Sequence, residues 1–174
     1  MRAAHVILTA LKEKDIEILW KWINDREQVI FNAPFQPIHE GQHHAWLEAV
    51  QHRKDIVIFA IRLRESGKLI GSCQLHNINP IHSTAELQIR LGDVAERSHG
   101  YGSQAVSLLL DFAFKDLNLN RVYLHVFINN AAAIRVYEKV GFALEGILRQ
   151  AAHIDGKYLD VMAMGILRQE YETA

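Results

Sequence analysis

The sequence predicts a single mixed α/β (α+β) domain, and three observations carry that prediction. The chain has 174 residues, of which 49% are hydrophobic and 22% charged, with three prolines, as in an ordinary globular domain. Segments with the apolar spacing of helices alternate with segments typical of strands. A strand, a helix and a second strand follow one another in the middle, which implies a parallel pair with a right-handed crossover. We therefore expect residues 1–174 to form one domain.

The first third of the chain predicts two helices followed by a hairpin. Two sets of apolar residues keep helical spacing: Ile16, Leu19, Trp20 and Ile23, then Ala45, Trp46, Ala49 and Val50. Between them, two prolines in residues 32–37 disfavour helix and predict a loop. Residues 56–61 and 69–75 are strand-like and flank a turn at residues 65–68, so we expect an antiparallel hairpin.

The middle third predicts the strand, helix and strand of the crossover. After a loop, residues 85–91 alternate apolar and polar, which puts Glu86, Gln88 and Arg90 on one face of a strand. Apolar residues then keep a helical period from Val106 to Leu117. Residues 121–127 alternate again as a strand.

The last third predicts a helix and two strands. Residues 131–140 form the helix, and Gly141 occupies the usual position just past a helix end. Residues 144–154 and 159–167 follow as strands joined through Asp155 and Gly156.

Charge and composition argue against nucleic acid or a membrane as partner. Nineteen basic against twenty acidic residues leave a net charge of −1, which supplies no field that attracts polyanions. No apolar run approaches the about 18 residues of a membrane span, and the run at residues 6–11 is too short for a secretory signal. The single cysteine, Cys73, lies in an apolar strand-like run and is interpreted as a packing residue. We expect a cytoplasmic protein.

The segment at residues 97–103 is a candidate phosphate site. It reads Arg97-Ser98-His99-Gly100-Tyr101-Gly102-Ser103 and lies between a strand and a helix. Glycines there let successive backbone N–H groups point to one spot at a helix N-terminus, where phosphate binds. An ordinary strand-to-helix turn would explain the two glycines equally well.

A dinucleotide site is the rival interpretation of the same glycines. Residues 100–105 satisfy a G-x-G-x-x-A pattern, but the first glycine lies too far beyond Leu91. No acidic residue ends the following strand at Phe127 to hold a ribose. A P-loop is excluded, because no Lys-Ser or Lys-Thr follows the glycines.

Two motifs in this order resemble those of the GNAT N-acetyltransferases. Residues 97–102 are similar to the acetyl-CoA motif (Gln/Arg)-x-x-Gly-x-(Gly/Ala) of that family, and residues 130–142 to its signature Asn-x-x-Ala-x-x-x-Tyr-x-x-x-Gly-Phe. With Glu145-Gly146 and residues 155–160, the chain most resembles the RimJ/RimL and spermidine-acetyltransferase branch. The resemblance implies a GNAT fold, with a mixed sheet of about seven strands, a splayed parallel pair and about four flanking helices.

The resemblance also implies acetyl-CoA as co-substrate and names the residues that bind it. The pantetheine arm would lie between the splayed strands at residues 86–91 and 121–127, and the pyrophosphate at the glycine loop. The implied cofactor-binding residues are Ile89, Arg90, Leu91, Arg97, Ser98, His99, Gly100, Tyr101, Gly102, Ser103, Asn130 and Tyr137. Asn130 would also cap the helix that follows it.

Three side chains are candidate catalytic residues. A typical amine with a pKa of about 10 is protonated at neutral pH, so attack on a thioester needs a general base. Glu86 aligns with the base of histone-acetylating members of the family, and His125 is the competitor, since imidazole accepts a proton near neutral pH. Tyr137 matches the general acid of the family and would hydrogen-bond the departing sulfur. Each of the three could instead serve packing or local hydrogen bonding.

The acceptor is expected to be the primary amine of a small cationic molecule. In the family its pocket is built by the first two helices, their loop and the last strands, and the candidate substrate-binding residues there are Asp25, Phe35, Glu40 and Asp155. A polyamine or an amino sugar, including an aminoglycoside, is the first choice. Phe31-Asn32-Ala33-Pro34-Phe35 replaces a glutamate-rich loop of the spermidine enzymes, which leaves a protein N-terminus as an alternative.

Other chemistries receive little support from the sequence. His39, His43 and His44 could place two imidazoles on one helix face, but no third zinc ligand is identifiable, so we expect a solvated histidine face and no metal. No pattern for a covalent nucleophile occurs. A non-catalytic acyl-CoA-binding sensor is a further alternative, and a homodimer is expected from the resemblance alone.

Overall fold

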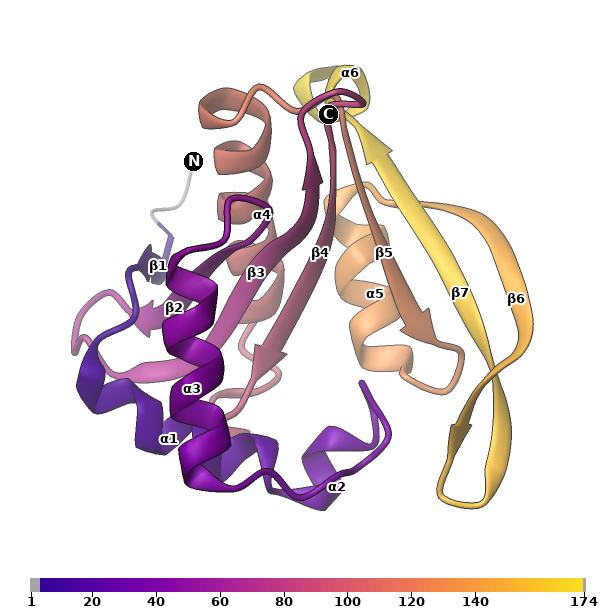
Figure 1. The fold of residues 1–174 in the computed structure, drawn as a ribbon. Helices are drawn as coiled ribbons and strands as arrows, with labels where there is room; N and C mark the ends of the chain where they lie inside the picture. Colours follow the sequence, from indigo (N-terminus) through magenta and orange to yellow (C-terminus); the bar gives the residue numbers. More distant parts are fainter. Residues whose placement is uncertain (1–3, 174) are drawn as a thin grey trace.

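A computed structural model describes residues 4–173 of the chain (Figure 1). Seven strands form one sheet in the order β1-β2-β3-β4-β5-β7-β6. The strands are β1 (Val6–Thr9), β2 (Val57–Leu63), β3 (Leu69–Asn79), β4 (Thr84–Leu91), β5 (Arg121–Phe127), β6 (Ala143–Ile154) and β7 (Lys157–Leu167). All neighbours pair antiparallel except β4 and β5, which are parallel. The predicted mixed sheet, its hairpins and its parallel crossover pair are confirmed.

Within residues 4–173, four α-helices of eight or more residues flank the sheet, and two shorter ones accompany them. The helices are α1 (Ile16–Ile23), α2 (Arg26–Val29), α3 (Glu40–Gln51), α4 (Tyr101–Asp111), α5 (Ala131–Val140) and α6 (Arg168–Thr173). The four long helices are those expected from the sequence. The four-residue α2 and the six-residue α6 were not expected, because neither is long enough to show an apolar period.

The main core lies between the sheet and the α4–α5 face. Helix α4 buries Ala105, Val106, Leu109 and Leu110 completely, and they pack in one cluster with Leu75, Ala85 and Leu87 of the sheet. The helix continues as a π-helical turn over Phe112–Asp116, which explains why apolar spacing extended to Leu117 in the sequence. In Figure 1, α3 crosses β2 and β3 on the opposite face, so the first half of the sheet is covered on both sides.

The sheet consists of two halves joined by a short ladder. β3 and β4 pair continuously from Glu86 to Leu91 and, past an irregularity, again at Thr84, and β5 and β7 pair along the whole of β5. Between β4 and β5, only Thr84–Glu86 and Arg121–Tyr123 are in register. In Figure 1 the two strands diverge toward their carboxyl ends, with α5 beneath the opening. The expected splayed pair is therefore present.

Candidate active site

Divergence of the two strands leaves one edge of β4 without a strand partner. Pairing with β5 ends at Glu86 and Tyr123, and β4 continues for five more residues, to Leu91. Backbone N–H and C=O groups on that edge need other partners, either water or a ligand. An extended ligand could therefore add to β4 as a strand does.

A cavity of about 640 Å³ opens beside this edge, and we call it the glycine-loop cavity. Its walls come from the end of β4, the loop before α4, the length of α5 and residues 28–32, which we call the α2 segment. Of the predicted cofactor-binding residues, those lining it are Ile89, Arg90, Leu91, Arg97, Ser98, Gly100, Tyr101, Gly102, Ser103, Asn130 and Tyr137. His99 is not among the lining residues; its ring stacks on Tyr101 with 5.5 Å between the centroids.

The loop before α4 has the backbone geometry that its glycines predict. Gly100 is the N-cap of α4 in a left-handed conformation, with φ of 78°. Gly102 lies where α4 meets α5, and a side chain there would contact Val136 at 3.6 Å. The free N–H groups of the first turn of α4 therefore begin inside the cavity wall, where an anion would meet them.

Arg135 and Lys139 give this cavity positive charge that the sequence analysis missed. Both line it from α5, four residues apart on either side of Tyr137. The sequence could have identified them by their i, i+4 spacing on the helix that carries Tyr137. Together with the dipole of α4, these cations favour a ligand with phosphate groups.

Two hydrogen bonds tie the α2 segment across the same cavity. Arg97 donates to Gln28 Oε1 at 2.7 Å and also to the carbonyl of Leu91. On the other side, Asn130 Nδ2 donates to the carbonyl of Phe31 at 3.0 Å, while its Oδ1 accepts from Ala133 N and caps α5. The α2 segment thus bridges the loop before α4 and the start of α5.

Glu86 and His125 form a hydrogen-bonded pair at the point where the strands separate. His125 Nδ1 lies 2.8 Å from Glu86 Oε1, and Asn77 Nδ2 donates to Glu86 Oε2 at 3.1 Å. A carboxylate only accepts, so the Nδ1 of His125 carries the hydrogen and Nε2 is left as a proton acceptor. The Glu86 side chain is 18% exposed and that of His125 40%, so the imidazole is the more accessible end. Two residues that the sequence offered as rival bases therefore form one unit.

Tyr137 is buried in the wall of the glycine-loop cavity. It is 6% exposed, its ring packs edge-on against Phe142, and burial raises the pKa of its hydroxyl to about 12. At neutral pH the hydroxyl keeps its proton and can donate a hydrogen bond.

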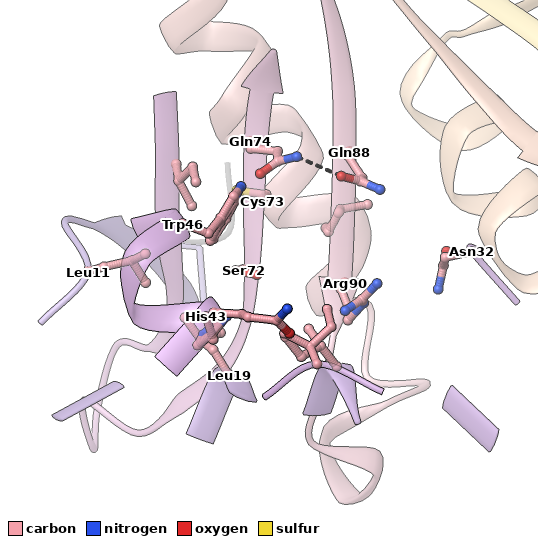
Figure 2. A pocket seen from close by; sticks show the side chains of 15 residues that line it. Leu11, Leu19, Asn32, His43, Trp46, Ser72, Cys73, Gln74, Gln88 and Arg90 are labelled. Atoms are coloured by element: carbon pink, nitrogen blue, oxygen red, sulfur yellow. Dashed lines mark hydrogen bonds between the residues drawn. The ribbon is translucent and has the colours of Figure 1, made fainter. Parts of the chain in front are cut away.

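A second cavity of about 360 Å³ lies between α1, α3 and the sheet, and we call it the α3 cavity (Figure 2). Its lining includes Leu19 and Ile23 of α1, His43 and Trp46 of α3, and Ile58 of β2. Asn32, Ile89 and Arg90 line both cavities. The two cavities therefore meet at the free edge of β4.

The four predicted substrate-binding residues lie outside the linings of both cavities. Asp25 stands at the N-cap position of α2, where its carboxylate accepts from the Gln28 side chain, and Asp155 pairs with Arg26 at 2.5 Å. Glu40 begins α3, 3.9 Å from His44, and Phe35 is partly exposed in the loop before it. Their part in binding an acceptor stays a prediction.

The expectation of a solvated histidine face is wrong for His43. This residue is 4% exposed, stacks on Trp46, and has no hydrogen-bond partner for Nε2. Burial, with a smaller effect of His44, lowers the pKa of its imidazole. The helix turns His43 toward the sheet, which spacing alone did not reveal. Among residues 4–173, no three His, Cys, Asp or Glu side chains gather as they would around a metal.

Cys73 is buried, and burial raises the pKa of its thiol to about 12. It is a packing residue in the wall of the α3 cavity, as the sequence indicated. Within the described residues, no helix combines the length and hydropathy that crossing a membrane requires.

Comparison with known proteins gives a consistent result. Residues 5–143 match the family profile described as an acetyltransferase (GNAT) domain. A spermidine N(1)-acetyltransferase of Vibrio cholerae is 32% identical, over 97% of this chain and 96% of the relative. A putative ribosomal N-acetyltransferase of Bacillus subtilis is 25% identical over 97% of this chain and 94% of its own length.

A solved structure resembles the chain throughout. It is a spermidine N-acetyltransferase from Vibrio cholerae in complex with CoA and spermine, with a TM-score of 0.90 and 30% sequence identity. The match covers 97% of this chain and 98% of that one.

We predict that Gly100→Val lowers the affinity for coenzyme A by about tenfold or more, measured by calorimetry. A branched side chain would stand where the pyrophosphate approaches the backbone. Gly67→Val is the matched control, because Gly67 also has a positive φ, 69° against 78°, and also faces open space, but lies in the β2–β3 turn. Both variants take on similar backbone strain, so equal CoA affinity in the two would contradict a pyrophosphate site at this loop.

Proposed function

The chain belongs to the GNAT acetyltransferase family, and from that premise we propose that it acetylates a primary amine of a polyamine. It is an N-acetyltransferase whose co-substrate is acetyl-CoA. We infer a polyamine acceptor from relatives of similar length, since both the curated relative and the structural neighbour are spermidine acetyltransferases. The proposal takes the chain as one domain, because all seven strands form one sheet. The proposal also includes a cytoplasmic location, because acetyl-CoA is an intracellular metabolite and Cys73 is unpaired.

One observation carries the proposed mechanism. The edge of β4 that faces the glycine-loop cavity becomes free just after Glu86, where Glu86 meets His125. A pantetheine arm that extends β4 along Ile89 to Leu91 would bring its thioester toward this pair. Its pyrophosphate would reach the first turn of α4, with Arg135 and Lys139 nearby.

The Glu86–His125 pair is the proposed base. Nε2 of His125 takes a proton from the incoming ammonium, directly or through a water, and the carboxylate stabilises the imidazolium that forms. The neutral nitrogen then attacks the thioester carbonyl, and the C–S bond breaks as the C–N bond is completed. Asn77 holds the carboxylate from its other oxygen at 3.1 Å, so the pair keeps one orientation.

Tyr137 stabilises the departing thiolate by a hydrogen bond. A thiol has a pKa near 8.5, so full proton transfer from a hydroxyl with a pKa of about 12 would be uphill by roughly 5 kcal/mol. The hydroxyl therefore acts as a donor to the developing charge, and the proton that completes CoA–SH comes from the amine that has just reacted.

The acceptor class has alternatives that one assay separates. A protein N-terminus is one alternative acceptor, which the Bacillus relative supports. An amino sugar is another, because it would present a similar amine. A non-catalytic sensor is set aside, because the family assignment is enzymatic.

We expect thiol release when the protein is mixed with acetyl-CoA and spermidine or spermine, followed with a thiol reagent. Glu86→Gln should lower kcat by about a hundredfold, because it removes the carboxylate that stabilises the imidazolium of His125 while leaving the cavity intact. The KM for acetyl-CoA should change by less than about threefold. Glu65→Gln, which neutralises an exposed carboxylate in the β2–β3 turn, is the control and should match the parent protein. Turnover only with an amino sugar or a peptide would replace the polyamine, and no turnover with any amine would overturn the proposal.

We expect Tyr137→Phe to lower kcat by about tenfold to a hundredfold with little change in CoA affinity, as stopped-flow turnover and calorimetry would measure. The hydroxyl acts only when charge develops on sulfur, so binding should not depend on it. Tyr171→Phe is the control, because it removes a hydroxyl that donates to the Ser107 carbonyl from α6. A loss of CoA affinity in Tyr137→Phe equal to its loss of kcat would contradict this role.

The enzyme is also proposed to form a homodimer through β6. This edge strand exposes Leu144, Ile147 and Leu148 to 52, 47 and 48% of their surface, and β7 is its one strand neighbour in the described sheet. Large exposed apolar side chains on an edge strand favour association. Light scattering after gel filtration should give twice the monomer mass, and Leu148→Glu should give the monomer; a parent protein that is monomeric at micromolar concentration would contradict the proposal.

A further inference from the structure

The α3 cavity is chemically unlike a site for a polycation. None of its 15 lining residues is acidic, and most of its wall is aliphatic or aromatic. Its amide groups satisfy one another in part, since Gln74 Nε2 donates to Gln88 Oε1 at 2.6 Å. Polyamine nitrogens would find no carboxylate on this wall. A ligand that fills the cavity must present mainly apolar surface.

Arg90 supplies the only full positive charge on the wall of the α3 cavity. Burial lowers the pKa of His43, which keeps that ring neutral at neutral pH. The guanidinium of Arg90 has no hydrogen bond or ion pair within residues 4–173, and burial without any opposing neighbour lowers its pKa. In Figure 2, Arg90 lies on the side of the cavity that faces Asn32, away from Trp46 and Leu11. A partly buried, unpaired guanidinium is costly unless a ligand brings an anion to it.

Arg90 lies beside the place where the acetyl transfer is proposed to occur. It lines both cavities, on the strand whose free edge faces the predicted thioester. If a ligand pairs its anionic group with Arg90, the ligand atoms next to that group lie close to the junction of the two cavities. An amine next to a carboxylate would be placed there, with its apolar side chain toward Trp46.

We propose a second class of acceptor for this enzyme: apolar or aromatic amino acids, whose carboxylate pairs with Arg90 and whose side chain occupies the α3 cavity. A volume of about 360 Å³ suits a molecule of this size and not a folded protein. The reaction is the one proposed above and rests on that proposal. The amino nitrogen loses a proton to the Glu86–His125 pair and bonds to the acetyl carbon, the C–S bond breaks, and CoA–SH and the N-acetyl amino acid are released.

The test compares amines that differ only by the carboxylate. Turnover of phenylalanine is measured against phenethylamine, and of leucine against 3-methylbutylamine, by thiol release and by mass spectrometry of the product. Because a charge-assisted, bidentate pair distinguishes the two members, kcat/KM should favour the amino acid by about tenfold or more. In Arg90→Gln this ratio should fall to about one, whereas Arg90→Lys should keep part of it. Arg53→Gln, which removes an exposed arginine paired with Asp55, is the control and should leave the ratio unchanged.

Each outcome separates this inference from the polyamine proposal. Spermidine turnover without turnover of either amino acid overturns the second acceptor class and leaves the first proposal standing. Equal kcat/KM for each amino acid and its decarboxylated partner overturns the role of Arg90. If Arg90→Gln raises the KM for acetyl-CoA and keeps the ratio, Arg90 binds the cofactor only. An inactive Arg90→Gln is resolved by the Lys variant and by phenylalanine binding to the CoA complex, which must weaken about tenfold if the inference is right.

Discussion

The separation of β4 from β5 after three residue pairs is the constraint on which the other features of this protein depend. β4 is held on its other edge by β3, and β5 on its other edge by β7, so each strand keeps a partner in its own half of the sheet where the two separate. Backbone groups on β4 are left for an extended ligand, and the loop that follows β4 must turn back toward the same opening. Glu86 and His125 face one another because each lies on the last part of the ladder or just beyond it.

Features set by local sequence were predictable. Gly100 and Gly141 both adopt positive φ at helix ends, as short-range turn chemistry requires, and Asn130 caps α5 with its side chain. Alternation along residues 85–91 correctly put Glu86, Gln88 and Arg90 on one face. The parallel pair followed from a strand, a helix and a strand in succession. The residues that line the glycine-loop cavity were predictable because most of them belong to two contiguous sequence motifs.

Features set by contacts between distant segments were not predictable. The orientation of His43 depends on how α3 lies over the sheet, and the i, i+4 spacing of the histidines did not say which of them turns inward. Arg26 and Asp155 pair across 129 positions, which occupies a carboxylate that the sequence offered to an acceptor. The α3 cavity combines residues from two helices, two loops and three strands, and no single period or motif marks such a wall. Glu86 and His125 were rivals in the sequence because their 39-residue separation hid their contact.

The bridge made by the α2 segment has a consequence for the timing of events at this site. Gln28 is held by Arg97, and the Phe31 carbonyl by Asn130, while Asn32, one residue further, belongs to the walls of both cavities. A molecule that breaks either hydrogen bond when it binds Arg97 or Asn130 releases one anchor of that bridge, and the wall at Asn32 is then less constrained. A ligand that breaks one of these bonds in the glycine-loop cavity would loosen the wall of the α3 cavity, and binding of the two substrates would then be coupled.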